Sequence, residues 1–144
     1  METSDLVEVA ALEARCFADP WSKALFLAEL EEREQNYPRV AVQGTRILGY
    51  LISWFVADEV HLGNIAVDPE QRGRGIARML LEDLIHQAEL RGSSYIVLEV
   101  RVGNESAIRL YRSYGFEDMA LRRGYYQDNG EDALIMIRLM GAEA

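Results

Sequence analysis

The segment QRGRGIAR, residues 71–78, places three arginines, two glycines and an alanine in a chain whose formal net charge is −9. It precedes a long amphipathic stretch and is therefore predicted to begin a helix. A helix start leaves about four backbone N–H groups unpaired and carries partial positive charge, which suits an anion. The small residues would let a diphosphate reach those amides, and the arginines would add charge at the rim. The predicted anion-binding residues are Arg72, Gly73, Arg74, Gly75, Ile76, Ala77 and Arg78.

Three nucleotide-binding motifs can be compared with this segment. A P-loop would need a Gly-Lys-Ser/Thr ending, which the sequence lacks. The dinucleotide fingerprint G-x-G-x-x-G is met only in its first two glycines, because Arg78 takes the third position. The pattern R-x-x-G-x-A is met by Arg72, Gly75 and Ala77. A helix start with solvated arginines is the alternative interpretation.

Two residues further along could carry acid–base chemistry. Glu99 lies within the apolar run 96–100, where burying a carboxylate is costly unless it is paired or functional. It could act as a base, pair with Arg101, or be exposed on one strand face; burial would raise its pKa. Tyr111 follows Asn104 by two helical turns, and a phenol can act as a proton donor to a leaving group. From its spacing alone, a core role for Tyr111 is the favoured interpretation.

The cysteine and the histidines indicate neither covalent catalysis nor metal binding. Cys16 is the single cysteine, which suits a reducing cytoplasm and predicts a packing role better than a nucleophile. His61 and His86 are the two histidines and form no metal-ligand pattern, so no metal is expected. His61 neighbours the candidate site and could tune it, whereas His86 is expected to be solvated.

The elements that must position these residues follow the order α-α-β-β-β-α-β-α-β-β, which predicts a mixed α/β sheet with packed helices. Gly63, inside the third strand, indicates either a bulge or close backbone approach, or an ordinary weak position. Asn104 is expected to cap the last helix and Gly92 to end the third. Strands are predicted at 39–43, 46–55, 59–67, 95–102, 116–121 and 133–139, and helices from residue 6, at 22–30, 75–91 and 104–114.

The motifs together resemble the GNAT-superfamily N-acetyltransferases. They are DPWS at 19–22, NIAVDPEQRGRGIARMLLEDLI from residue 64, LEVRVGNESAIRLYRSYGF from residue 98, and RRGYY at 122–126. The resemblance covers nearly the whole chain. Within the superfamily, the sequence is similar to members that acetylate the N-terminal alanine of a small-subunit ribosomal protein. It implies one GNAT domain over residues 1–144, with a mixed, mostly antiparallel sheet and helices on both faces.

The resemblance also implies roles for residues in a reaction that uses acetyl-coenzyme A. Glu99 would be the general base, directly or through water, and Tyr111 the general acid. Asn104 would contact coenzyme A as well as cap its helix. Strand backbone would bind the thioester carbonyl and the pantetheine amides, at Ile65, Ala66 and Val67. The acceptor peptide would be flanked by Trp21, Tyr125 and Tyr126.

Composition restricts the classes of partner. Hydrophobic residues make up 49% and charged residues 27% of the 144, which is typical of a folded domain. The sequence pI of about 4.7 argues against nucleic-acid binding and favours a neutral or basic macromolecular partner. The resemblance implies that this partner is the basic N-terminus of a ribosomal protein. The apolar runs are too short to span a bilayer and no signal peptide is evident, so we expect a cytoplasmic protein without membrane contact. The alternatives are a GNAT enzyme for another N-terminus, a lysine or a small amine, and a non-catalytic acyl-coenzyme A sensor.

Overall fold

The computed structural model describes residues 1–17, 19–31 and 35–141, in which the predicted element order is confirmed. Every predicted strand end lies within one residue of the observed end. The helices of the described residues are α1 (Leu6–Cys16), α2 (Lys23–Glu31), α3 (Ile76–Leu90) and α4 (Glu105–Ser113), with short 3-10 turns at Thr3–Asp5 and Pro69–Gln71. The strands are β1 (Arg39–Gln43), β2 (Arg46–Val56), β3 (Glu59–Val67), β4 (Tyr95–Arg101), β5 (Glu117–Arg122) and β6 (Ala133–Leu139).

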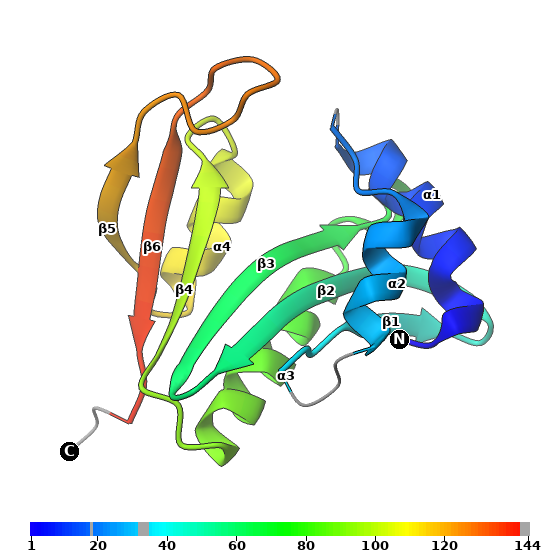
Figure 1. The fold of residues 1–144 in the computed structure, drawn as a ribbon, viewed down its shortest axis with the longest axis horizontal. Coiled ribbons are helices and arrows are strands. Elements are labelled where there is room, and N and C mark those ends of the chain that lie inside the picture. The colour runs from blue at the N-terminus through cyan, green and yellow to red at the C-terminus, as the bar shows by residue number, and fades with distance from the viewer. Residues whose placement is uncertain (18, 32–34, 142–144) are drawn as a thin grey trace.

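The strands form one sheet in the order β1-β2-β3-β4-β6-β5. The β3–β4 pair is parallel, and the other neighbouring pairs are antiparallel. Helices α1 and α2 cover one face of the sheet, and α3 and α4 the other (Figure 1). The expected mixed, mostly antiparallel sheet with helices on both faces is therefore confirmed.

Alternation along the central strands separates the two faces. In β2, Tyr50 and Ile52 pack in the cluster with α1 and α2, while Leu51 and Phe55 pack in the cluster with α3. Such a strand, buried on both faces, reads as a continuous apolar run. In β4 the burial alternates strictly, so Glu99 lies on the face opposite the buried residues on either side of it.

Local signals set the ends of the two helices on the α3 side. Gly92, at φ +71°, follows α3, and Ser93 N–H donates to the carbonyl of Ala88 at 3.0 Å, as in a Schellman motif. The predicted helix stop is therefore confirmed. Asn104 Oδ1 accepts from the amide of Ala107 at 3.3 Å, which confirms the predicted cap of α4.

The sheet parts between β3 and β4. The two strands pair only from Glu59–Tyr95 to Leu62–Leu98, and each then continues without the other (Figure 1). In the β2–β3 ladder Ile52 pairs with Asn64 and Ser53 with Leu62, so Gly63 is an extra, bulged residue. A bulge bends and twists its strand, here at the point where β3 leaves β4.

The bulged glycine also lies directly under an indole ring. A Cβ built on Gly63 would lie 2.3 Å from two ring carbons of Trp54. The predicted bulge and the predicted close approach thus both occur, although the approaching group is a side chain rather than backbone.

We expect Gly63→Ala to lower the free energy of unfolding by about 1–3 kcal/mol, because Trp54 must move to admit the methyl group. Urea unfolding followed by circular dichroism measures the change. In a Trp54→Leu background the same substitution should cost less, since the overlapping ring is gone. Equal costs in the two backgrounds would contradict the overlap.

Candidate active site

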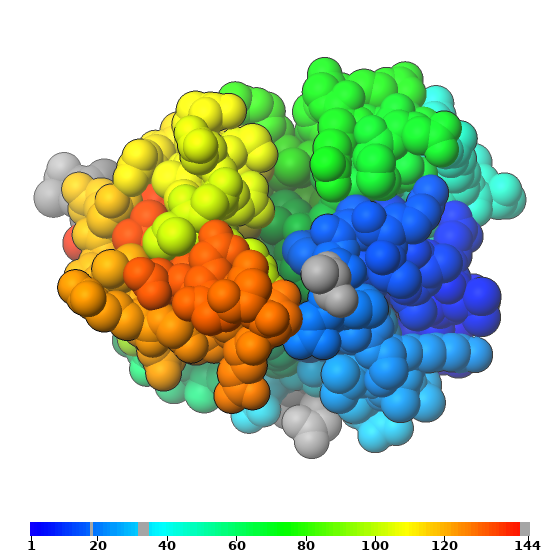
Figure 2. Space-filling view, turned by 90° about the horizontal axis from the view of Figure 1, so that it is seen from above, coloured from blue at the N-terminus to red at the C-terminus, as the bar shows by residue number. Residues whose placement is uncertain are grey.

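A pocket of about 260 Å³ lies where α3 begins, beside α4. Seen from above, the start of α3 (green) and α4 (yellow) flank a depression in the surface (Figure 2). We call it the α3 pocket; it is lined by Val67, Gln71, Arg72, Gly73, Gly75, Ile76, Ala77, Arg78 and Leu110. The structure thus brings most of the predicted anion-binding segment into one cavity.

The start of α3 leaves backbone donors at this pocket. The first helical hydrogen bond is donated by Met79 N–H to the carbonyl of Gly75, at 3.0 Å. The amides of Ile76, Ala77 and Arg78 precede that bond and have no intrahelical partner. Gly75 caps the helix at φ +80°, a conformation that favours glycine. All four residues line the pocket, so its wall can offer N–H groups and a helix dipole to an anion.

The predicted arginines divide between the pocket and its surroundings. Arg72 and Arg78 line the pocket, whereas Arg74 is not among its lining residues and donates to the side chain of Gln71. Upstream, the Asp68 carboxylate accepts from Glu70 N–H at 3.0 Å, and this bond is the main reason that its pKa is lowered. Arg15 and Arg46 each pair with the same carboxylate at 3.4 Å, which ties the segment to α1 and β2.

Of the predicted strand residues, Val67 lines the pocket, whereas Ile65 and Ala66 do not. Beyond Leu62, β3 pairs with β2 on one side, and within the described structure it has no strand partner on the other. The backbone there is available to an extended ligand. Asn104 caps α4 and is not a lining residue of the pocket.

Cys16 lies beside the same end of β3. Its Sγ is 3.5 Å from the carbonyl oxygen of Val67 and 3.9 Å from Arg72. Burial raises the pKa of the thiol, which therefore stays protonated at neutral pH. This is the inert, packed environment that the sequence predicted for Cys16.

Tyr111 is in the core, as its spacing favoured, with its ring 5.7 Å from that of Phe116. Burial raises the pKa of the phenol, so it is a protonated donor at neutral pH. No hydrogen bond joins the hydroxyl to another residue of the described structure, yet no fully buried polar side-chain atom there lacks a partner. The hydroxyl must therefore reach solvent. A core position and an accessible phenol thus coexist.

On the opposite face of the sheet, a row of contacts runs from the α1–α2 connection to the β5–β6 connection. The Trp21 and Trp54 ring centroids are 6.4 Å apart, and Trp54 packs edge-on to His61 at 5.5 Å. His61 Nε2 lies 3.1 Å from Glu99 Oε1, and Tyr125 donates its hydroxyl to that oxygen at 3.4 Å. We call this the Trp21–Tyr125 row. It brings two predicted acceptor-binding residues to either side of the predicted base.

The structure corrects the predicted electrostatics of Glu99. Its pKa is lowered rather than raised, because the hydrogen bond from His61 outweighs the effect of burial. The same bond raises the pKa of His61. Pairing of Glu99 with Arg101, one of the alternatives, does not occur, because Arg101 points elsewhere. Leu62 and Leu98 are paired in register, which sets His61 diagonally opposite Glu99.

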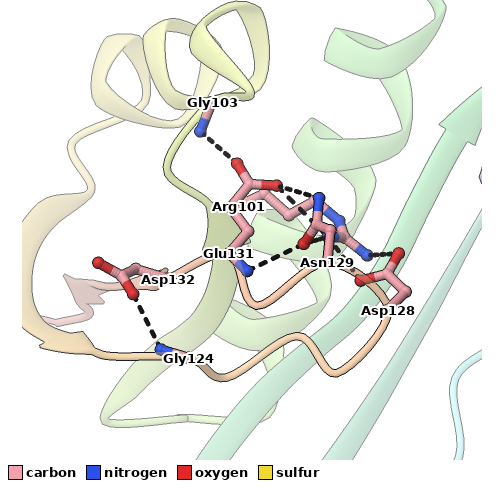
Figure 3. Close-up of polar contacts among 7 residues, drawn as sticks. All are labelled: Arg101, Gly103, Gly124, Asp128, Asn129, Glu131 and Asp132. Atoms are coloured by element: carbon pink, nitrogen blue, oxygen red, sulfur yellow. Dashed lines mark hydrogen bonds and ion pairs between the residues drawn. The ribbon is translucent and has the colours of Figure 1, made fainter.

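Arg101 instead holds the connection between β5 and β6, which we call the 123–132 loop. Its guanidinium binds both carboxylate oxygens of Asp128, at 2.9 and 3.1 Å, and Glu131 at 3.3 Å (Figure 3). It also stacks 4.0 Å above the ring of Tyr126. Glu131 accepts from Gly103 N–H at 2.8 Å, which joins the loop to the β4–α4 connection. Tyr126, the third residue predicted to flank the acceptor peptide, is thus positioned by Arg101, which the carboxylates of Asp128 and Glu131 hold in place. We call this arrangement the Arg101 clamp.

Glu13 was not identified from the sequence. It is 2% exposed on α1 and accepts from Trp21 N–H and the Asn64 side chain, each at 2.9 Å, and from the Tyr50 hydroxyl. Burial raises its pKa. The signal that could have found it is its phase, because Glu13 falls four residues after Val9 on the apolar stripe.

Metal-ligand clusters and long apolar helices are both absent from the described ranges. No group of three or more histidines, cysteines and acidic residues there could hold a metal ion. None of the helices there is both long and apolar enough to cross a membrane.

Comparison with known proteins gives a consistent result. Residues 6–116 match the Acetyltransferase (GNAT) family. The chain is 42% identical to [ribosomal protein bS18]-alanine N-acetyltransferase of Escherichia coli K12, over 94% of this chain and 92% of that protein. It is 40% identical to N-alpha-acetyltransferase RimI of Mycobacterium tuberculosis, over 96% and 89%. The crystal structure of the Escherichia coli ribosomal-protein-S18-alanine N-acetyltransferase superposes with a TM-score of 0.90 at 38% identity, covering 100% of this chain and 93% of that one. The resemblance drawn from the motifs is confirmed.

We expect Arg101→Met to speed hydrogen exchange at the loop amides of Gly124, Tyr126 and Gly130 by about tenfold, because the clamp on the loop is lost. Mass spectrometry of exchanged peptides measures this. Arg112→Met is the matched control, since it removes an exposed arginine–carboxylate pair between α4 and β5. Native protection of the 123–132 loop in Arg101→Met would show that the clamp does not order it.

Proposed function

Because the chain belongs to the GNAT acetyltransferase family, we propose that it transfers the acetyl group of acetyl-coenzyme A to the N-terminal alanine of ribosomal protein bS18. The family implies the acetyl donor. The acceptor is the one named for a relative that is 42% identical over almost the full length of both chains. That match is the observation that carries the acceptor. With a ribosomal protein as acceptor, the proposed reaction would take place in the cytoplasm.

The α3 pocket supports binding of the coenzyme's diphosphate. Its wall combines unpaired amides at the start of α3 with the guanidinium groups of Arg72 and Arg78. Gly73 and Gly75 both have positive φ and leave open space where a Cβ would lie. The residues present therefore fit an anion bound against the backbone. Ile65, Ala66 and Val67 would bind the pantetheine arm through the unpaired edge of β3, with Asn104 and Arg74 at the periphery.

The chemistry requires a neutral amine and a proton for the departing thiolate. An α-amino group has a pKa of about 7.7–8.0, so one readily lost proton must leave before nitrogen attacks the thioester carbon. Glu99, ionised at neutral pH because its pKa is lowered, takes this proton directly or through water. As the C–S bond breaks, Tyr111 supplies a proton to sulfur, which its protonated phenol allows.

The Trp21–Tyr125 row would receive the first residues of the acceptor. Trp21 is fixed through its amide by Glu13, and Tyr125 reaches Glu99 from the 123–132 loop. Tyr126 is held beside it under Arg101. In the space-filling view, this loop (orange) and the α1–α2 segment (blue) face each other (Figure 2). The net charge of −9 would speed encounter with a basic ribosomal protein, an effect that salt weakens.

A panel of acceptors with acetyl-coenzyme A tests the proposal. We expect mass spectrometry to locate one acetyl group on the α-amine of a peptide with the Ala-initiated sequence of bS18. The same peptide blocked at its N-terminus but containing lysine, and a polyamine, should react far more slowly. Faster reaction of either control would replace the proposed acceptor, and failure of every acceptor would leave an acyl-coenzyme A binding protein.

We expect Glu99→Gln and Tyr111→Phe each to lower kcat by about 10²–10⁴-fold at neutral pH, the usual contribution of a positioned acid or base. Both substitutions preserve shape, so calorimetry should show coenzyme A binding with native affinity. Native turnover in either variant would remove that residue from the mechanism.

A further inference from the structure

The mechanism above leaves His61 unused, although it makes the shortest polar contact of Glu99. Their Nε2–Oε1 distance is 3.1 Å, and the side chains are 42% and 19% exposed. The imidazole therefore joins a half-buried carboxylate to the solvent. Trp54 packs edge-on against its ring, which limits the orientations that His61 can take.

We propose that His61 is a catalytic base of the acetyl transfer and that Glu99 acts on it as the orienting carboxylate. This inference rests on the proposed function and replaces Glu99 by His61 as the group that takes the proton from the amine. His61 donates its Nε2–H to Glu99 Oε1, which leaves the lone pair on Nδ1. The proton leaves the acceptor's ammonium group through a water molecule and comes to rest on Nδ1, while Glu99 stays ionised.

The proton and the bonds balance in this sequence. The ammonium group loses one proton to His61, its nitrogen bonds to the thioester carbon, and the C–S bond breaks as sulfur is protonated by Tyr111. The second proton, which the nitrogen loses as the amide forms, returns to the Tyr111 phenolate through water. The imidazolium is stabilised by the adjacent carboxylate and then returns its proton to solvent across its exposed edge. A carboxylate that orients a histidine and stabilises its charged form is a recurring arrangement in acyl transfer.

The pKa shifts favour the imidazole of His61 over the carboxylate of Glu99 as the group that receives the proton. The pKa of Glu99 is held below its ordinary value, far from the 7.7–8.0 or so of an α-amine. The pKa of His61 is raised by the Glu99 hydrogen bond, against the effect of burial, and so moves toward that of the amine. A base works best when its pKa lies near the working pH.

Among the described residues, the charged and titratable groups around His61 can be assigned. Glu99 is the charged group that acts on His61 from β4. Tyr125 donates to Glu99, and Arg122 at the end of β5 lies near enough to lower the pKa of that carboxyl. On the β2 side, Trp54 faces the ring and donates its own N–H to Glu29 at 2.6 Å. None of these groups supplies a second base beside Glu99.

The first test is the pH dependence of His61→Gln with the bS18 peptide. We expect kcat/KM to fall by about 10²-fold at pH 7. The deficit should shrink by about tenfold between pH 7 and pH 9, because the amine then arrives already neutral. A merely structural role would give the same deficit at every pH and would overturn the proposal, as would native kcat/KM at pH 7.

His86→Gln is the matched control, since His86 is the other histidine, is exposed on α3 and has no part in the site. It should retain native kcat/KM at all pH values. His61→Asn gives a second substitution in case His61→Gln folds poorly, and native coenzyme A affinity identifies a folded variant.

The second test needs no acceptor, so it separates this proposal from the proposed function. We expect NMR titration of the free protein to give His61 a pKa above its ordinary value. Glu99→Gln should return it to that value or below, because burial is then the remaining influence. An unchanged His61 titration in Glu99→Gln would overturn the coupling. Absence of bS18 acetylation by the native protein would instead overturn the function.

Discussion

The parting of β3 from β4 is the constraint on which the rest of the site depends. The parallel pairing ends at Leu62–Leu98, although both strands continue. Unpaired strand edges inside a fold are costly unless something else satisfies them, so the open edge of β3 is a place for a ligand's amides. The bulge at Gly63 and the Trp54 ring above it turn β3 away from β4 at this point. The α3 pocket and the Trp21–Tyr125 row then lie on opposite faces of the sheet, at the gap between β3 and β4.

The buried Glu13 and the half-buried Arg101 fix the segments on the two sides of the gap between β3 and β4. On one side Glu13 gathers the Trp21 amide and the Asn64 side chain, which joins α1 and the loop after it to β3. On the other, Arg101 binds the 123–132 loop through Asp128 and stacks on Tyr126. Each charge has several partners, and losing a partner from such a group costs much more than losing an exposed pair. The side chains flanking Glu99 are therefore fixed relative to β4.

Electrostatics act at two ranges in this protein. The chain as a whole is acidic, at −9, which favours a basic macromolecular acceptor. Yet the proposed anionic donor would need positive potential, and Arg72, Arg78 and the start of α3 offer it locally at the α3 pocket. Across the sheet, the His61–Glu99 contact raises the proton affinity of one group and lowers that of the other. The two proposed substrates, one anionic and one basic, would thereby meet opposite potentials on different faces of the sheet.

Local sequence patterns alone determined the elements and indicated the segment that we propose binds an anion. Strand alternation, the apolar stripe of α3, the Gly92 stop and the Asn104 cap act between residues close in the chain, so the sequence was sufficient to predict them. The motifs around Gly75, Glu99 and Tyr111 likewise indicated the family, because each motif is a short continuous stretch of the chain.

Only the tertiary structure decided how those residues act on one another. Arg101 pairs with Asp128 rather than with Glu99, and Glu13 accepts a hydrogen bond from the amide of Trp21. Both contacts join residues that are not neighbours in the chain. The direction of the Glu99 pKa shift is the clearest case. Burial and a hydrogen bond oppose each other there, and the balance depends on the strand register that brings His61 within 3.1 Å. A sequence shows which groups can interact, but their free energies depend on distances that the packed sheet sets.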